Sequence, residues 1–437
     1  MSVATAPKTV EAVEISTHIL SQLFDSQAQK RLHVQLWNGT YWPDAEPRRV
    51  TLILRHPGAL RSMFLPGTEV GLGEAYIYND FDIEGEVEQL FSVVDSVVNT
   101  VSGLGKKIKL GRELLQLPER RGEWVLSSRR GPAKLTGREH SIDRDRQAVT
   151  YHYNVSNEFY SLWLDKRMVY SCAYFKSPAD HIDLAQEQKL DLICRKLRLH
   201  PGQRLLDIGC GWGGLILYAA QNYGVDATGI TLSQPQADQA NQRIREAGLS
   251  DTCRATVSDY RQLDETEPYD VLVSVGMFEH VGAAMLPEYF NKAYRILRPG
   301  GAFLNHGIAV GKEVEGSSRG TSFSQAYVFP DGELEPIHVT LEAAANSHFE
   351  VRDVESLREH YALTLRQWIS RLEARHAEAL QFVDEPIYRT WRLYMSASAY
   401  GFTDGRLNVF QSLLVKPQEN GISGLPLTRE DWYAPHK

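Results

Sequence analysis

The chain has 437 residues, which is enough for two or three domains with a sizeable core. Its net charge of −8 argues against a general nucleic-acid-binding protein, and its four cysteines lack the C-x-x-C spacing of a structural zinc site. The N-terminus does not resemble a signal peptide, and no run of about 18 apolar residues could span a bilayer. We therefore expect a cytoplasmic protein without a metal, whose contact with any membrane is peripheral.

The first part of the chain, residues 1–103, predicts a small α+β domain. RRVTLILRH (48–56) alternates aliphatic and polar residues like a strand, and GEVEQLFSVVDSVVNTV (85–101) has the periodicity of an amphipathic helix. PGALRSMFLPG (57–67) predicts a second helix, bounded by proline and glycine.

Residues 104–144 predict a basic linker. Ten lysines and arginines between Leu104 and Arg138 face only three glutamates, on a chain that is acidic overall. The basic residues are Lys106, Lys107, Lys109, Arg112, Arg120, Arg121, Arg129, Arg130, Lys134 and Arg138. This local excess of positive charge indicates an anionic partner, although a solvated linker is the competing interpretation.

From residue 145 to residue 437 the pattern predicts a separate domain in which strands and helices alternate. The alternation is that of a doubly wound parallel sheet in an α/β fold. Residues 340–412 predict mostly helices, and the last ~20 residues predict an extended tail. The expected strands are 203–209, 226–232, 254–259, 269–277 and 302–310, and the expected helices are 213–223, 233–248 and 286–301.

The segment LLDIGCGWGG (205–214) places glycines between a strand and a helix, where backbone can approach a ligand closely. Such a loop can also be only a tight turn. A dehydrogenase would carry an acid after the second strand, but that position reads GITLSQPQ, and no Lys-Ser/Thr follows the glycines as in a phosphate-binding loop. The loop resembles motif I of class I S-adenosylmethionine (SAM) methyltransferases; an NAD domain with an unusual ribose contact is the alternative.

Seven segments together resemble the cyclopropane-fatty-acyl-phospholipid synthases and their relatives, the mycolic-acid cyclopropane synthases. The resemblance implies a class I SAM-methyltransferase fold, Rossmann-like with a seven-stranded doubly wound sheet, which carries helical lipid-binding insertions. It also implies transfer of a methylene unit from SAM to a cis double bond of a phospholipid acyl chain. The segments are YHYNVSNEFYSLWLDKRMVYSCAYF, LDIGCGWGG, GITLSQPQ, FEHVG, LNHGI, YVFPDGELEP and HYALTLRQW.

The resemblance also implies which residues bind SAM. Tyr170 and Ser171 would contact its amino-acid end, and Asp259 and Tyr260 would flank its adenine. Thr231, Leu232 and Gln236 would hold the ribose region. The glycine loop would wrap the cofactor with Leu205, Leu206, Asp207, Ile208, Gly209, Cys210, Gly211, Trp212 and Gly213.

In this family a bound bicarbonate ion acts as the base. The matching residues are Cys172 and Ile308, through backbone groups, and Glu279, His306 and Tyr361, through side chains. Taken singly, each side chain has a plainer interpretation, as a helix cap, a structural histidine or a core aromatic.

Cys172 alone would suggest a nucleophile, but the implied reaction forms no covalent enzyme intermediate, so we expect its thiol to be dispensable. His152 and His280 are expected to be structural or near the cofactor. Core packing competes with an acyl tunnel as the role of the aromatic residues Tyr153, Phe159, Tyr160, Trp163 and Tyr174.

A phospholipid substrate implies an enzyme on the inner face of the cell membrane. The basic segment 104–138 would attract anionic headgroups, with Trp124 at the interface, and the family suggests a homodimer. The nearest alternative activity forms a methylene- or methyl-branched chain from the same cation. More distant alternatives are a small-molecule methyltransferase and a catalytically silent lipid- or SAM-binding protein.

Overall fold

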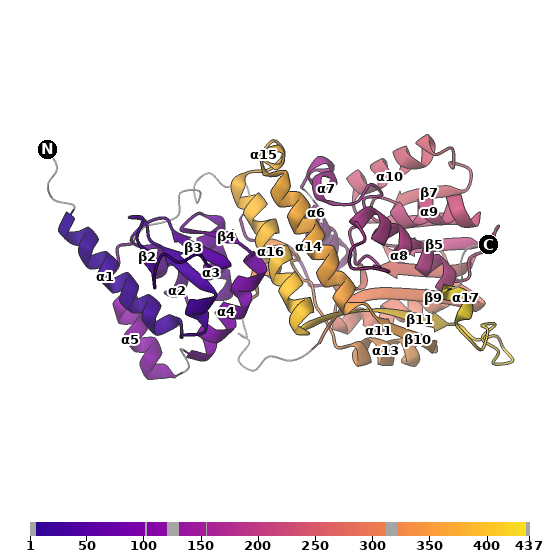
Figure 1. Ribbon diagram of the computed structural model, residues 1–437. Helices are drawn as coiled ribbons and strands as arrows, with labels where there is room; N and C mark the ends of the chain where they lie inside the picture. Colours follow the sequence, from indigo (N-terminus) through magenta and orange to yellow (C-terminus); the bar gives the residue numbers. More distant parts are fainter. Residues whose placement is uncertain (1–5, 101–102, 120–130, 154, 312–320, 434–437) are drawn as a thin grey trace. The chain divides into compact units, whose positions relative to one another are not determined.

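The computed structural model describes residues 6–100, 103–119, 131–153, 155–311 and 321–433, and these form two compact units (Figure 1). Unit 1 joins the N-terminal 132 residues to 316–328 and 376–400, and unit 2 contains the remainder. The predicted bounds at 103 and 144 differ from this division, because composition along the chain does not reveal which distant segments pack together. Among the described residues, no helix combines the length and apolarity needed to cross a membrane.

Unit 1 contains a four-stranded sheet in the order β2-β1-β3-β4, in which only the β1–β3 pair is parallel. Arg389 of α16 links its helix to α3 and β4: its guanidinium donates to the carbonyls of Tyr76 (2.8 Å) and Phe81 (2.6 Å). The strand predicted at 48–56 and both predicted helices are confirmed, but the first helix was missed. The elements are α1 (Ala6–Leu23), β1 (Leu32–Gln35), β2 (Tyr41–Trp42), β3 (Val50–Leu54), α2 (Ala59–Phe64), α3 (Glu69–Ile77), β4 (Phe81–Gly85), α4 (Val87–Thr100), α5 (Leu104–Leu114), α12 (Phe323–Tyr327), α15 (His376–Ala379) and α16 (Glu385–Asp404), whose last residues belong to unit 2.

Unit 2 is built on a seven-stranded sheet in the order β10-β11-β9-β8-β5-β6-β7. Strands β5 to β9 pair in parallel, whereas β11 runs antiparallel to both β9 and β10. The expected seven-stranded, doubly wound α/β fold is therefore confirmed. The strands are β5 (Arg204–Ile208), β6 (Asp226–Thr231), β7 (Cys253–Val257), β8 (Tyr269–Val275), β9 (Leu297–Val310), β10 (Glu350–Ser356) and β11 (Leu407–Val415).

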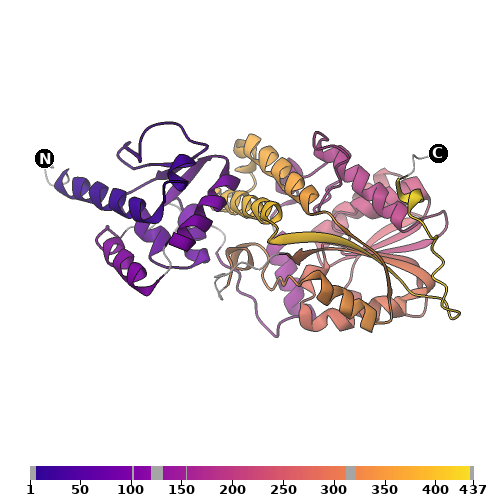
Figure 2. The same ribbon diagram turned by 60° about the horizontal axis from the view of Figure 1, so that its bottom comes forward.

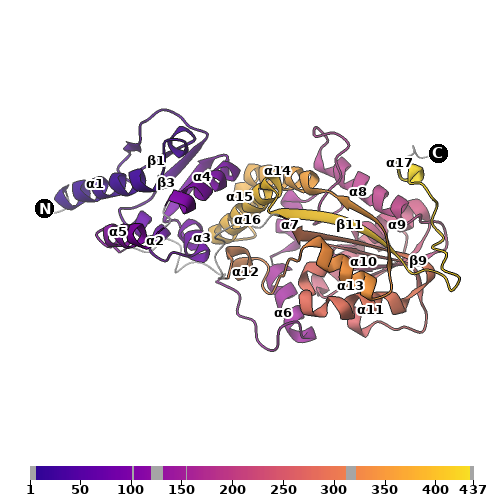
Figure 3. The ribbon, with the colours of Figure 1, turned by 90° about the horizontal axis from the view of Figure 1, so that it is seen from below.

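Helices cover both faces of this sheet because successive strand residues point to opposite sides. Leu205 packs toward α8, α9 and α10, whereas Leu206 and Ile208 pack toward α11 and α13. Figures 2 and 3 show the two helical layers with the sheet between them. The helices are α6 (Ile142–Tyr153), α7 (Asn157–Trp163), α8 (Ile182–Lys196), α9 (Gly214–Tyr223), α10 (Gln234–Glu246), α11 (Leu286–Ile296), α13 (Ile337–Asn346), α14 (Arg358–Ala374) and α17 (Glu430–Tyr433).

The region 340–412 is mostly helical, as expected, but it also includes β10 and most of β11, which join the sheet through long-range pairing. One sequence-based prediction for unit 2 was wrong. The helix expected at 286–301 ends at Ile296, and β9 already begins at Leu297. The C-terminal tail is extended apart from α17, whose Trp432 is buried.

Candidate active site

A glycine-rich loop follows β5, and its backbone explains its composition. Gly209, Gly211 and Gly213 have φ angles of +92°, +53° and +76°, a region that residues with a Cβ rarely adopt. A Cβ on Gly209 would also lie 2.6 Å from the Cβ of Met277, whereas one on Gly211 would meet no atom within 4 Å. The loop therefore presents open backbone at the carboxyl end of the sheet, where ligands bind in such folds.

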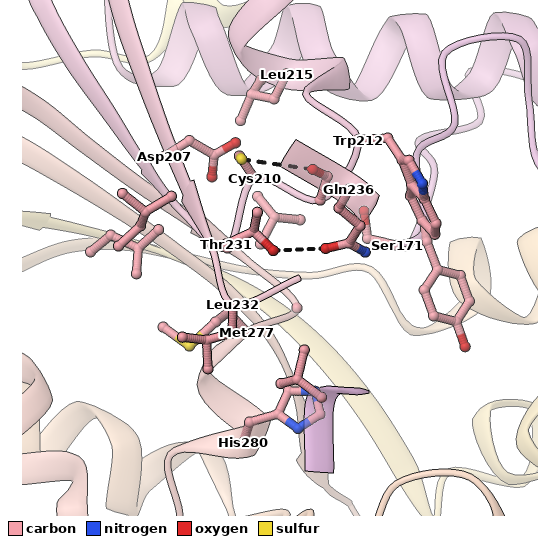
Figure 4. Close-up of a pocket in the computed structure, with 18 of the residues that line it drawn as sticks. Ser171, Asp207, Cys210, Trp212, Leu215, Thr231, Leu232, Gln236, Met277 and His280 are labelled. Carbon is pink, nitrogen blue, oxygen red and sulfur yellow. Dashed lines mark hydrogen bonds between the residues drawn. The ribbon is translucent and has the colours of Figure 1, made fainter. Parts of the chain in front are cut away.

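The pocket at this loop is lined by most of the residues expected to bind SAM (Figure 4). Three expected residues lie elsewhere: Leu205 and Leu206 are buried in the core on opposite faces of β5, and Gly213 packs toward Ala240. The lining includes Tyr170, Ser171, Asp207, Ile208, Gly209, Cys210, Gly211, Trp212, Thr231, Leu232, Gln236, Asp259 and Tyr260.

Asp207, one residue before the end of β5, lines this pocket, and one of its carboxyl oxygens lacks a hydrogen-bond donor in the described structure. Its Oδ1 is buried and has no hydrogen-bond partner among the described residues. Burial raises the pKa of Asp207 to about 7, against the opposing positive charge of Lys189. A ligand with a donor or a cationic group would satisfy this carboxyl, as the amino group of SAM would.

Lys189 of α8 reaches the same pocket and was missed by the sequence analysis. Its ammonium is buried and donates to the hydroxyl of Ser171 at 2.9 Å. Burial lowers the pKa of Lys189 to about 8, although Asp165, Cys172 and Asp207 oppose that shift. A lysine on the apolar face of a helix is the only signal that could have indicated this residue.

Strand β6 and helix α10 each supply a polar group to the pocket. The Thr231 hydroxyl donates to Oε1 of Gln236 at 2.8 Å, as Figure 4 shows. Ser233 caps α10 by accepting from the backbone N–H of Gln236. This arrangement gives neutral hydrogen-bonding groups where a dehydrogenase would present a carboxylate.

Two acids that line the pocket, Asp145 and Asp259, are paired with Arg261, a contact that the sequence analysis did not predict. Arg261 donates to Asp259 (2.6 and 2.8 Å) and to Asp145 (2.7 Å), and its guanidinium lies 5.3 Å from the ring centre of Tyr260. His280 lines the pocket as well, and burial lowers its pKa to about 4, so that its imidazole is neutral near pH 7. The uncharged ring and the paired acids suit a neutral ring system such as adenine.

Two of the five expected bicarbonate ligands, His306 and Ile308, lie on β9, and a third, Glu279, contacts Ile308. The Glu279 carboxylate accepts from the backbone N–H of Ile308 at 2.8 Å, while its Oε2 is buried and has no partner among the described residues. Burial raises the pKa of Glu279 to about 7. His306 precedes Ile308 by two residues on the same strand face, and its Nε2 is likewise buried without a partner in the described structure.

The other two expected ligands, Cys172 and Tyr361, are joined through Leu357. The carbonyl of Leu357 accepts from the Cys172 thiol at 3.7 Å and from the Tyr361 backbone N–H at 3.1 Å. Burial raises the pKa of Cys172 well above its ordinary value. None of the five residues lines the glycine-loop pocket itself, but Cys172 and Glu279 are sequence neighbours of Ser171 and His280, which do.

The aromatic residues singled out by sequence form a packed cluster. Tyr160 and Trp163 are fully buried, with ring centres 5.4 Å apart, and Tyr160 lies 5.0 Å from Trp212. Of that set only Tyr153 lines the pocket, whereas Tyr174 stacks on His360 at 4.8 Å. Core packing therefore accounts for Tyr160 and Trp163. Among the described residues, no cluster of histidine, cysteine and acidic side chains could hold a metal ion.

Comparison with known proteins identifies the family. The model of the mycolic acid cyclopropane synthetase family matches residues 140–412. A probable fatty acid methyltransferase of Pseudomonas putida is 40% identical over 405 residues, which cover 92% of this chain and 96% of the relative. The cyclopropane-fatty-acyl-phospholipid synthase of Escherichia coli K12 is 38% identical over 271 residues, covering 62% of this chain and 68% of that protein.

A solved structure extends the likeness to the fold. The mycolic acid cyclopropane synthase CmaA1, crystallised with S-adenosylhomocysteine (SAH) and CTAB, is 34% identical, with a TM-score of 0.58 over 62% of this chain and 97% of that one. The range matched by the family model, 140–412, includes the glycine loop, the residues that line the pocket and the end of β9. This chain therefore belongs to the mycolic acid cyclopropane synthetase family and is a SAM-dependent methyltransferase.

Proposed function

We propose that this enzyme transfers a methylene unit from SAM to the cis double bond of a phospholipid acyl chain and so forms a cyclopropane ring. Membership of the family supports SAM-dependent chemistry on a lipid. The observation that carries the finer proposal is the pair of buried polar atoms, Glu279 Oε2 and His306 Nε2, that have no partner among the described residues.

The reaction requires a dry site that tolerates positive charge. When bound, SAM supplies an electrophilic methyl group on a sulfonium. The alkene electrons form a bond to that methyl carbon as the carbon–sulfur bond breaks, which leaves SAH and a cation on the acyl chain. Loss of a proton from the new methyl group then lets its C–H electron pair close the ring. The buried, protonated thiol of Cys172 does not intercept the cation, as a thiolate would.

The residues at the β9 end fit a bicarbonate ion. Glu279 with a pKa near 7 can donate or accept a hydrogen bond, and His306 adds a second polar group. The Tyr361 hydroxyl is the third side-chain group that the family resemblance assigns to the ion. A bicarbonate held there would supply the base for the methyl proton. Because Ile308 donates its N–H to Glu279, that carboxyl is already positioned without the ion.

The test uses SAM and vesicles of a cis-monounsaturated phospholipid, with and without bicarbonate. We expect the acyl chains to gain the mass of one CH2 and to show upfield ring-proton NMR signals, with faster turnover when bicarbonate is present. Mass gain without ring protons would exclude the cyclopropane product. No mass gain on any unsaturated lipid, in an enzyme that binds SAH, would contradict the phospholipid substrate.

A second candidate product is a methylene-branched chain. The Pseudomonas putida relative, which matches nearly the whole chain, is named a probable fatty acid methyltransferase, whereas the Escherichia coli synthase matches a smaller part. A hydride shift to the first cation would place the charge on the carbon that bears the new methyl group. Proton loss from that methyl would then leave a methylene branch on the chain, whose vinyl protons appear far downfield of ring protons in the same NMR experiment.

We also propose that the enzyme acts as a homodimer at an anionic membrane surface. Helix α5 exposes Lys106, Lys107 and Lys109 together with the apolar Ile108 and Leu115 just beyond its end. Mixed basic and apolar exposure suits the surface of an anionic bilayer. Arg120, Arg121, Trp124, Arg129 and Arg130, which the sequence analysis also assigned to this surface, lie outside the described residues. Sedimentation velocity would test the dimer, and a single monomer boundary at micromolar protein would contradict it.

A further inference from the structure

A row of polar side chains, buried except for the partly exposed Glu355 at its edge, crosses three neighbouring strands of the unit 2 sheet. The strand register pairs Glu355 of β10 with Gln411 of β11, and Gln411 with His306 of β9. Directly opposed residues share one face of a sheet. Lys196, at the end of α8, is buried over this row and contacts its first two members.

The donors and acceptors in this row can be assigned in order. Lys196 Nζ pairs with the Glu355 carboxylate and donates to Oε1 of Gln411 at 2.8 Å. Since an ammonium can only donate, the Gln411 oxygen must face Lys196, and its NH2 group must face the other way. That NH2 group lies 3.2 Å from Nδ1 of His306, which must accept.

This order determines the state of the imidazole. Burial and the positive charges of Lys189 and Lys196 hold the pKa of His306 well below its ordinary value, so the ring is neutral. A neutral ring whose Nδ1 accepts carries its proton on Nε2. That Nε2 is the buried atom without a partner among the described residues.

We propose that Lys196 and Gln411 are positioning residues that hold His306 in the Nε2–H tautomer, so that the imidazole presents a donor to an anion in the active site. Burial lowers the pKa of Lys196, and the Glu355 carboxylate paired with it opposes that shift and favours the ammonium. The functional role of this donor rests on the proposed function. The tautomer itself is a property of the protein and can be measured without turnover.

The other interpretation is that the row only satisfies a buried lysine. Under that interpretation the orientation of the Gln411 amide has no consequence for the imidazole. The two interpretations differ in the protonation of His306 when the row is altered. Gln411→Glu provides the sharper test, because a carboxylate cannot donate and would accept from a proton on Nδ1. Lys196→Met removes the group that orients the amide.

The experiment records long-range ¹H–¹⁵N spectra of the full chain labelled with ¹⁵N-histidine, with the His306 signals identified by their loss in His306→Gln. In the wild-type protein we expect unprotonated Nδ1 and protonated Nε2 across about pH 5–8, where free histidine would titrate. Gln411→Glu should move the proton to Nδ1 or leave the ring doubly protonated, and Lys196→Met should give a mixture of tautomers. A wild-type Nδ1 that is protonated, or a Gln411→Glu spectrum identical to wild type, would overturn the proposal.

A matched control separates positioning from general loss of stability. Lys292 is another buried lysine of unit 2 and does not line the pocket. Its ammonium donates to the Leu263 carbonyl and, at 2.8 Å, to the Glu265 carboxylate. Lys292→Met should leave the His306 signals unchanged. In turnover assays, Lys196→Met and Gln411→Glu should lower kcat roughly ten- to a hundredfold, the size of effect seen when the hydrogen-bond partner of a metal-binding histidine is mutated, without weakening SAH binding. Altered tautomers with an unchanged kcat would overturn the functional part of the proposal. A wild-type enzyme that makes no ring would count against the proposed function and leave the tautomer result standing.

Discussion

The thiol of Cys172 is buried and donates to the carbonyls of Ala173 (3.3 Å) and Leu357 (3.7 Å). Its raised pKa keeps it protonated, so it cannot act as a nucleophile near pH 7. We expect Cys172→Ala to retain turnover within about tenfold of wild type and to lose about 1 kcal/mol of unfolding free energy through a small cavity. Turnover on vesicles and urea unfolding would measure the two effects.

Cys253→Ala provides the matched control for that substitution. Cys253 is equally buried but lies on β7, away from the pocket. Both variants should lose similar stability. If Cys172→Ala folded and bound SAH but gave no product while Cys253→Ala remained active, the thiol would have to take part in the chemistry.

The buried carboxyl of Glu279 should make stability depend on pH. Its pKa is raised from 4.5 to about 7, so the folded state binds more protons than the unfolded state between these values. The resulting stabilisation is complete below about pH 4.5 and is lost as the pH rises through about 7. The difference is on the order of 3 kcal/mol. Glu279→Gln should therefore lose less unfolding free energy than wild type between about pH 5 and 8, as measured by urea unfolding.

Glu342→Gln on α13 is the control, because that glutamate is exposed. Its stability should follow the wild-type pH profile. A Glu279→Gln profile parallel to wild type would show that the carboxyl does not titrate in this range. The same variant should lose most of its turnover, since an amide cannot replace the protonation states that Glu279 offers to the site.

At the scale of elements, the sequence predicted helices and strands that depend on local patterns better than strands that depend on long-range pairing. The βα units from β5 to β8 were predictable because helix caps such as Ser233 and short runs of buried apolar residues can be recognised from neighbouring residues. β10 and β11 were not, because β11 pairs antiparallel with β9, about 100 residues away in the sequence, and β10 pairs in turn with β11. The Lys196–Gln411 contact was missed for the same reason, and only the family resemblance brought His306 into consideration.

The glycine loop allows a prediction that separates backbone strain from ligand contact. Gly211 and Gly202 both have positive φ angles, of +53° and +82°, and a Cβ on either would meet no atom within 4 Å. Alanine at each position should therefore cost about 1–2 kcal/mol of unfolding free energy through the left-handed backbone alone. Only Gly211 lines the pocket, so only Gly211→Ala should also weaken SAH binding.

Calorimetric titration with SAH and urea unfolding of both variants would check this prediction. Gly202→Ala serves as the control for strain. Equal loss of SAH binding in the two variants would mean that strain spreads through β5, and unchanged binding in Gly211→Ala would remove this glycine from the cofactor site.

For the whole molecule, the arrangement of charge predicts how it meets a lipid. The chain carries a net charge of −8, so attraction to an anionic bilayer requires a local basic surface rather than the overall charge. We expect replacement of Lys106, Lys107 and Lys109 by glutamine to weaken sedimentation with anionic vesicles at low salt. Each lysine contributes up to about 1 kcal/mol near such a surface. Neutral vesicles should show no difference.

The control replaces three exposed basic residues of unit 2, Lys166, Lys176 and Arg245, and so changes the net charge by the same amount. If attraction depends on α5, only the α5 variant loses binding, and raising the salt removes the difference because exposed charges are screened beyond about 10 Å at 0.1 M. Equal losses in both variants would mean that net charge governs binding. Unchanged binding of the α5 variant at low salt would show that helix α5 is not the membrane-facing surface.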